Sequence, residues 1–360
     1  MEHSNILIVG GGCAGISVAS RINSLKSDLS ISIIEPSEKS LYQAAWTLVG
    51  AGAYDVGNTI KPMSEVMPSY VKWIKEHAEE FMPDSNSVKT NSNTYTYDYL
   101  VVCPGLKLNF DGVAGLKESL GKNNVCTNYS AEMATYTWEC LKNLDGGTLL
   151  FTEPPMPIKC AGAPQKIAYL AADHLKKKGK LNDSHLEFLC AKPVIFGVPH
   201  FQGPLNEICD SYGIQRSFQH NLISIDGQAK EAVFKQSDKD GNSKEVTKKF
   251  DFIHVTPPQT SPDFIKNSPL ADAGGWVDVD HKVGTLRHTK YENVYSLGDV
   301  MNAPNAKTGA AVRKQAPIVA HNIVKDINKS SEDYRNYDGY GACPLTVAYG
   351  KVMLAEFCYG

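Results

Sequence analysis

The N-terminal segment constrains the fold more strongly than any other region of the chain. Residues 5–9 form an apolar run that leads into Gly10, Gly12 and Gly15, and the following residues place apolar side chains on one helical face. In such a strand, turn and helix, the first glycine permits a tight turn, the second lets a pyrophosphate approach the backbone, and the third lets the helix pack on the sheet. The segment therefore predicts a dinucleotide-binding fold.

An acidic residue at the expected distance supports this prediction. Residues 31–34 predict a second strand, and Glu35 follows it about twenty residues after the glycines. A carboxylate in this position accepts hydrogen bonds from the ribose hydroxyls of an adenosine. A lone GxGxxG can arise by chance, but the acid at this spacing favours a true dinucleotide site.

The length and composition fit a globular protein of two domains. The chain has 360 residues, 42% of them hydrophobic and 21% charged, which is enough material for two full-sized cores. No apolar run approaches the roughly 20 residues of a membrane-spanning helix. The formal net charge of -3 indicates no excess of positive charge of the kind that binds phosphate backbones, so we expect no nucleic-acid partner. The cysteines contain no CxxC pair and the histidines no ligand spacing, so we also expect no metal site.

The C-terminal third indicates which dinucleotide is bound. Residues 294–297 predict a short strand that ends in Gly298 and Asp299. An aspartate there can hold the hydroxyls of a ribityl chain, which FAD has and NAD lacks. Residues 307–318 open a helix whose N-terminal amides would stabilise negative charge on a reduced flavin. We therefore expect one FAD domain built from both chain ends, although Asp299 alone would also fit a turn or helix cap.

The middle of the chain predicts a second Rossmann-like α/β domain, inserted into the first. Strands are expected at 148–152, 185–189 and 250–255, with helices between them. This region contains no second GxGxxG. The FAD-binding domain is expected to comprise residues 1–112 and 282–330, the second domain residues 113–281, and the start of a C-terminal region residues 331–360.

Cys160 occupies the place where a second phosphate loop would be expected. After residues 151–152 the chain continues with prolines and then this cysteine, so NAD(P)H is a poor candidate for the electron donor. Electrons from a sulfur nucleophile can enter instead if Cys160 pairs with a second cysteine, because a thiolate cleaves a disulfide by attack at one sulfur. Cys343, after the helix that follows the flavin segment, is the candidate partner. Any one of the nine cysteines is more often an inert buried residue, and we expect this of the other seven.

These residues resemble a known family, the eukaryotic-type (type II) sulfide:quinone oxidoreductases of the flavoproteins with two dinucleotide-binding domains. The resemblance covers nearly the whole chain and is most specific at residues 42–52, 158–167, 273–280 and 338–345. It implies that Cys160 and Cys343 are the redox pair. It implies a set of residues that hold or approach FAD, namely Gly10, Gly12, Gly15, Glu35, Gln43, Trp46, Gly298, Asp299, Lys314 and Gln315.

The resemblance also implies a reaction. Hydrosulfide would cleave the disulfide between Cys160 and Cys343, two electrons would reach FAD and then ubiquinone, and glutathione, sulfite or coenzyme A would remove the sulfane sulfur. Lys166 would either lower the pKa of a thiol or face solvent at the start of a helix. The family resemblance places the protein at the mitochondrial inner membrane.

One departure from the family leaves two other functions open. Relatives continue past the position of Phe357 with amphipathic helices that dock on the membrane and help to form a quinone pocket, whereas this sequence stops at Gly360 and shows no presequence. The expectation is therefore peripheral membrane association by resemblance only, with the membrane tail missing. The alternatives are a type II NADH dehydrogenase-like flavoprotein, which requires a second glycine-rich loop, and a tail-less FAD-binding remnant or redox sensor without quinone turnover.

Overall fold

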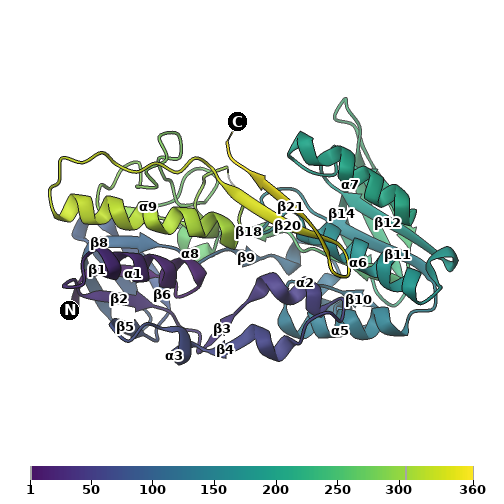
Figure 1. The fold of residues 1–360 in the computed structure, drawn as a ribbon, viewed down its shortest axis with the longest axis horizontal. Helices are drawn as coiled ribbons and strands as arrows, with labels where there is room; N and C mark the ends of the chain where they lie inside the picture. Colours follow the sequence, from purple (N-terminus) through teal and green to yellow (C-terminus); the bar gives the residue numbers. More distant parts are fainter. Residues whose placement is uncertain (1, 305, 360) are drawn as a thin grey trace.

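The computed structural model describes residues 2–304 and 306–359. The expected domain ranges begin at Met1 and end at Gly360, and these two residues lie outside the described part of the chain. Figure 1 shows two α/β lobes side by side, with the N-terminal strands and the long helix α9 in one lobe and α5, α6 and α7 in the other. A yellow C-terminal hairpin lies between them. Among the described residues, none of the helices combines the length and apolar character needed to span a membrane.

The first lobe is built around a seven-stranded sheet with the order β5-β2-β1-β8-β7-β6, in which β19 pairs with β8. Strands β5, β2, β1, β8 and β19 are parallel to one another, and β6 and β7 form an antiparallel extension. The pairing of β19 with β8 joins the C-terminal region of the chain to the N-terminal region. The strands are β1 (Glu2–Val9), β2 (Ile31–Ile34), β5 (Val71–Ile74), β6 (Ala78–Met82), β7 (Ser87–Thr90), β8 (Thr94–Val102) and β19 (Val294–Ser296).

Two helices from opposite ends of the chain cover this sheet together. Helix α1 (Cys13–Leu25) buries Val18, Ala19 and Ile22, whose spacing forms one apolar stripe. Helix α9 (Gly309–Ile327) packs against it in Figure 1. The expectation of one lobe assembled from both chain ends is therefore confirmed.

The second lobe contains a five-stranded parallel sheet with the order β10-β17-β11-β12-β13. The expected strands at 148–152, 185–189 and 250–255 correspond to β11, β12 and β17. An antiparallel meander of β14, β15 and β16 adjoins it. The elements are β10 (Val125–Cys126), α5 (Ala131–Asn143), β11 (Gly147–Glu153), α6 (Ala163–Lys177), β12 (Ser184–Cys190), α7 (Pro199–Tyr212), β13 (Gln215–Phe218), β14 (His220–Asp226), β15 (Glu231–Ser237), β16 (Ser243–Lys249) and β17 (Phe252–His254).

The chain crosses between the lobes at a two-stranded pairing of β9 (Lys107–Leu108) with β18 (Gln259–Thr260). Downstream of β18, Ile265, Leu270 and Val277 are buried in the same apolar core as the strands of the first lobe. We therefore propose to place the end of the second domain near β18, rather than after residue 281, because the core membership changes there.

Short elements complete the fold. The hairpin of β20 (Gly341–Ala348) and β21 (Lys351–Phe357) packs against α6. The remaining α-helices and strands are β3 (Lys39–Leu41), α2 (Trp46–Val49), β4 (Ile60–Pro62), α3 (Met63–Val66), α4 (Leu116–Ser119) and α8 (Asp263–Lys266).

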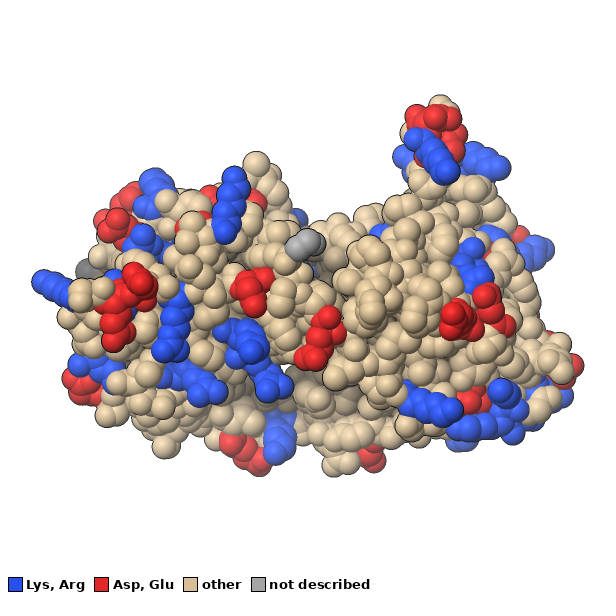
Figure 2. All heavy atoms as spheres, turned by 45° about the horizontal axis from the view of Figure 1, so that its top comes forward, with Lys and Arg blue, Asp and Glu red and all other residues tan. Residues whose placement is uncertain are grey.

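On the face drawn in Figure 2, acidic and basic side chains are intermingled and form no extended patch of one sign.

Candidate active site

The three glycines of the N-terminal motif have distinct surroundings. Gly10 has φ +108°, and a Cβ there would lie 2.4 Å from the carbonyl oxygen of Cys103. A Cβ at Gly15 would lie 1.9 Å from the carbonyl oxygen of Gly10, whereas a Cβ at Gly12 would have no atom within 4 Å. Gly10 and Gly15 thus permit close packing of the turn and helix. Gly12 leaves open space in front of the helix N-terminus, which fits the pyrophosphate of FAD.

Glu35 adjoins this open space. It follows β2, and its Oε2 accepts a hydrogen bond of 2.8 Å from the amide of Gly11. Its Oε1 accepts one of 2.8 Å from the amide of Ser37. The carboxylate is therefore held beside the glycine turn, in the position from which it would bind the ribose hydroxyls.

The C-terminal segment meets the same turn from the other side. A Cβ on Gly298 would lie 3.3 Å from the Cβ of Ala14, in the first turn of α1. The amide of Gly298 donates a 2.9 Å hydrogen bond to Oε1 of Gln315, which is fully buried on α9. Within the described residues, the Nε2 of Gln315 is buried without a partner. Burial also raises the pKa of Asp299. An unsatisfied amide and a carboxyl group beside the turn fit a polar ligand such as FAD.

The two candidate redox cysteines meet between α6 and β20. Cys160 lies in the loop before α6 with φ +53°, and its amide donates a 2.9 Å hydrogen bond to the carbonyl of Lys307. Cys343 is fully buried on β20. A Cβ on Gly162 would lie 3.6 Å from the Cβ of Cys343, and the thiols of Cys160 and Cys343 interact directly. Side chains far apart in the sequence are thereby brought together.

The two thiols have opposite electrostatic environments. Interaction with the Cys343 thiol lowers the pKa of Cys160 well below its usual range, and the charge of Lys166 lowers it further. The Nζ of Lys166 lies 3.5 Å from the sulfur of Cys160. Lys166 is buried, so it does not face solvent. The interaction with Cys160, together with burial, raises the pKa of Cys343. The ammonium of Lys166 therefore favours a thiolate on Cys160 over one on Cys343.

Two lysines that sequence reasoning did not assign lie beside this pair. Lys159 and Lys307 form a short parallel bridge between their backbones. The Nζ of Lys307 donates hydrogen bonds to the carbonyls of Asp299 at 2.6 Å and Met301 at 3.0 Å, and burial lowers its pKa to about 8. The Nζ of Lys159 donates to Oε1 of Gln43. Lys307 therefore connects the cysteine loop to the segment of Asp299. In the sequence, the one sign of a role for Lys307 is its place at the start of residues 307–318, the segment expected to open the flavin helix.

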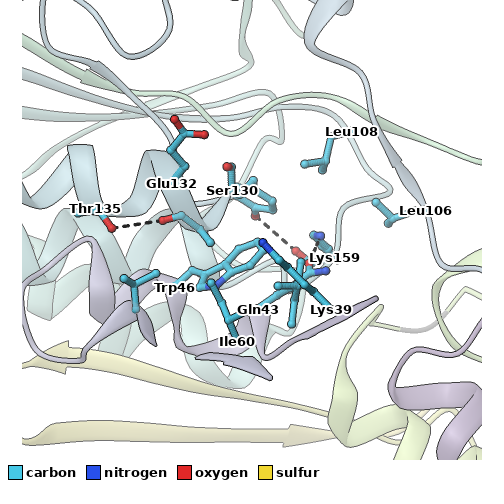
Figure 3. Close-up of a pocket in the computed structure, with 14 residues that line it drawn as sticks. Lys39, Gln43, Trp46, Ile60, Leu106, Leu108, Ser130, Glu132, Thr135 and Lys159 are labelled. Carbon is cyan, nitrogen blue, oxygen red and sulfur yellow. Dashed lines mark hydrogen bonds between the residues drawn. The ribbon is translucent and has the colours of Figure 1, made fainter. Parts of the chain in front are cut away.

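A cavity of about 660 Å³ adjoins the loop that contains Cys160, because the preceding residue, Lys159, lines it. Figure 3 shows the side chains that line this cavity. Gln43 and Trp46, which the resemblance places near FAD, line it together with Lys159. Lys39 lies on the same side of the cavity as Lys159 in Figure 3. The rest of the lining comes from Leu41, Val56, Ile60, Leu106, Leu108, Tyr129, Ser130, Ala131, Glu132 and Thr135.

One expected site residue points elsewhere. Lys314 is exposed on α9, and its ammonium lies 5.3 Å from the ring centre of Tyr340. Its neighbour Gln315 instead faces inward, because successive helical residues point in different directions. A role for Lys314 beside the flavin stays a prediction.

The carboxyl end of β11, where a second dinucleotide would bind, is differently built. Glu153, the last residue of β11, is buried, and burial raises its pKa to about 7. It forms an ion pair with Lys192, which follows β12. This position carries a buried carboxyl group, which would repel a pyrophosphate, rather than a turn of free backbone amides.

Comparisons with known proteins agree with this architecture. A family model described as pyridine nucleotide-disulphide oxidoreductase matches residues 4–138. A mitochondrial sulfide:quinone oxidoreductase from Mus musculus is 40% identical over 99% of this chain and 79% of its own length. One from Dictyostelium discoideum is 44% identical over 99% of this chain and 78% of its own. The crystal structure of the enzyme from Aquifex aeolicus is 23% identical, with a TM-score of 0.82 over 99% of this chain and 87% of that one.

The sequence identity to these two relatives extends over 99% of the chain. The chain also spans more than three quarters of each relative, so the identity establishes the family. The glycine turn, Glu35 and the segment of Asp299 fit the cofactor that this family binds. The chain belongs to the sulfide:quinone oxidoreductases, a family of FAD-binding flavoproteins.

Proposed function

We propose that this protein oxidises hydrogen sulfide through Cys160 and Cys343, delivers two electrons to FAD and then to ubiquinone, and transfers the sulfane sulfur to a small acceptor. The observation that carries the proposal is the meeting of these two thiols beside Lys166. The names of the relatives, which act on sulfide and quinone, support it. Because both relatives are named mitochondrial, we also propose a mitochondrial location, at the inner membrane.

The asymmetry of the two thiols suggests the direction of the first step. In the oxidised protein, hydrosulfide would attack the sulfur of Cys343, the disulfide bond would break, and Cys160 would leave as a thiolate beside Lys166. Cys160 is the better leaving group because the ammonium of Lys166, 3.5 Å from its sulfur, stabilises its thiolate. The products are a persulfide on Cys343 and a thiolate on Cys160.

The remaining steps return the pair to its starting state. A nucleophilic acceptor would take the outer sulfur of the persulfide and leave a second thiolate, on Cys343. Re-formation of the bond between Cys160 and Cys343 then releases two electrons. FAD, when bound, supplies a two-electron acceptor that can pass them to a quinone. Through these steps Lys166 holds a positive charge against the sulfur of Cys160.

The cavity beside the cysteine loop suits an anionic acceptor. Lys39 and Lys159 both line it, and Lys159 is the residue directly before Cys160. Ammonium groups favour the thiolate or sulfite form of an acceptor such as glutathione, sulfite or coenzyme A. We propose that the acceptor approaches the persulfide through this cavity.

Anaerobic stopped-flow mixing tests the proposed electron donor. The FAD-loaded protein is mixed separately with NADH and with excess sulfide, whose second equivalent serves as the nucleophilic acceptor of the sulfane sulfur, and the flavin absorbance is followed. We expect sulfide to bleach the flavin and NADH to leave it oxidised, because Glu153 is buried at the end of β11, where a second pyrophosphate would bind. Bleaching by NADH and not by sulfide would overturn the proposal in favour of an NADH dehydrogenase.

Steady-state turnover separates the proposed enzyme from a redox sensor on the same fold. Sulfide and decylubiquinone are supplied together, with sulfite as the sulfur acceptor. The proposed function predicts continuous reduction of the quinone. Reduction of the bound flavin by sulfide without any turnover would identify a sensor or remnant.

A further inference from the structure

The two redox cysteines belong to elements that run side by side. Cys160 lies in the loop just before α6, and Cys343 lies near the start of β20, which packs along that helix. At the active-site end, a Cβ on Gly162 would lie 2.3 Å from Cδ2 of Leu345, so strand and helix loop are in tight contact there. The position of Cys343 therefore depends on how β20 sits on α6.

At the far end of the same pair of elements, a buried carboxylate holds the hairpin. Asp173 lies in the last turns of α6 and is 8% exposed. Its Oδ2 accepts a 2.9 Å hydrogen bond from the amide of Tyr349, in the turn between β20 and β21. The same oxygen forms a 2.9 Å ion pair with Lys177. Burial alone would raise the pKa of Asp173, but the bonds from Lys177 and Tyr349 lower it, so the group is a carboxylate.

The two attachment points lie well apart along both elements. From Gly162 to Asp173 the helix rises by about 16 Å, and from Leu345 to Tyr349 the strand extends by about 13 Å. Because both attachments are tight, β20 has little freedom to slide along α6. A shift by one residue would also turn Cys343 to the opposite face of the hairpin.

Neighbouring contacts hold the turn but do not replace this bond. The hydroxyl of Tyr212, on α7, donates a 3.2 Å hydrogen bond to the carbonyl of Val347. The hydroxyl of Tyr349 donates to the carbonyl of Ala51, which follows α2. Both are side-chain hydroxyls at the ends of long side chains. Of the hydrogen bonds described for this hairpin tip, the one to Asp173 joins α6, the helix of the Cys160 loop, directly to the hairpin backbone.

We propose that Asp173 is a positioning residue for the redox pair, which fixes β20 in register on α6 and so keeps Cys343 against Cys160. This inference rests on the proposed function, in which the disulfide between these two cysteines is broken and re-formed in each cycle. The bond to Asp173 raises the effective concentration of one thiol at the other, because the strand is held in the geometry that the disulfide requires.

The test measures the thiol-disulfide equilibrium rather than activity. FAD-loaded protein is equilibrated anaerobically in glutathione redox buffers, the thiols are alkylated, and the fraction with a Cys160–Cys343 disulfide is determined by mass spectrometry. Asp173→Ala should lower the equilibrium constant for disulfide formation about tenfold, which makes the potential about 30 mV less negative. Asp173→Asn, which keeps an acceptor oxygen for Tyr349, should fall between this variant and the unchanged protein.

Two control variants separate positioning from general destabilisation. Lys177→Met removes the ion pair and the contact of Nζ with the Tyr349 ring, 4.3 Å from its centre. It leaves the bond from the Tyr349 amide to Asp173, so the equilibrium constant should stay unchanged. Glu187→Gln alters another buried carboxylate of the same lobe, which binds Lys248 at 3.0 Å and lies far along the chain from the hairpin. It should lower the melting temperature without changing the equilibrium constant.

Specific outcomes overturn the inference. A folded Asp173→Ala protein, or Asp173→Asn if that variant alone folds, with an unchanged equilibrium constant would show that Asp173 does not position the pair. A fall of equal size in Glu187→Gln would assign the effect to stability and overturn it as well. If the unchanged protein forms no Cys160–Cys343 disulfide in any buffer, the proposed function itself fails.

Discussion

The Nζ of Lys166, near the start of α6, lies 3.5 Å from the sulfur of Cys160 in the loop before that helix. A buried ammonium at this distance stabilises a thiolate. The same pairing helps to explain why Cys160 and Cys343, two residues of one type in contact, differ in their pKa.

Replacing Lys166 should therefore change the pH dependence of Cys160. In the reduced protein, alkylation of Cys160 by iodoacetamide should stay fast as the pH falls from about 9 to about 7, because its pKa is lowered and the thiolate persists. An opposite charge nearby moves a pKa by about 1–3, so Lys166→Met should slow alkylation near neutral pH by about tenfold or more. Peptide mapping of the alkylated cysteine checks this. Equal rates in both proteins at neutral pH would remove Lys166 from the control of Cys160.

Two glycines of the dinucleotide turn should respond differently to alanine. A Cβ at Gly15 overlaps the backbone of Gly10, whereas a Cβ at Gly12 meets no protein atom. Gly15→Ala should lower the FAD content. It should also lower the free energy of unfolding of the apoprotein by about 1–3 kcal/mol. Gly12→Ala should lower FAD affinity alone, because it fills the space left for the pyrophosphate. Flavin titration and denaturant unfolding of the apoproteins distinguish the two effects, and a destabilised Gly12→Ala apoprotein would contradict them.

Gly162 should be required for the contact between the cysteine loop and the hairpin. A Cβ there would lie 2.3 Å from Cδ2 of Leu345, so in Gly162→Ala the Leu345 side chain or the strand that carries it must shift. We expect destabilisation by about 1–3 kcal/mol and slower disulfide formation. The double change Gly162→Ala with Leu345→Ala removes the overlap and should restore the rate of disulfide formation to a large extent. No recovery in the double variant would show that the overlap is not the cause.

The acceptor cavity makes a separate kinetic prediction. Lys159→Met should raise the KM for sulfite about tenfold, the effect expected from losing one charge-assisted hydrogen bond, and should leave bound FAD in place. Lys61→Met, an exposed lysine of β4 outside the cavity lining, serves as the matched control. A KM that changes equally in both variants, or in neither, would place the acceptor elsewhere.

The regions of the fold that sequence predicts well depend on local patterns. The strand, glycine turn and helix at residues 5–25 and the strand before Asp299 were predicted from apolar spacing and turn residues, and they form β1, α1 and β19. The strand that carries Cys343 was not predicted, although the alternation of apolar residues from Cys343 to Val347 is the signal that indicates it.

The features that were missed arise from contacts distant in sequence. Lys307 is buried against the carbonyls of Asp299 and Met301, and a single lysine in a polar segment gives no sign of burial. The bond from Asp173 to Tyr349 joins residues on two different elements, and only the packing of β20 on α6 brings them together. Such pairs cannot be read from one sequence.

The central claim is that Cys160 and Cys343 together transfer electrons from sulfide, and single serine variants test it most directly. FAD-loaded Cys160→Ser and Cys343→Ser proteins are mixed anaerobically with excess sulfide, which also acts as the sulfur acceptor. Cys358→Ser, which changes an exposed cysteine, is mixed in the same way as the control. The flavin absorbance should bleach in the control and stay oxidised in both other variants, with FAD content unchanged in all three. Sulfide-driven bleaching in either Cys160→Ser or Cys343→Ser would contradict the account.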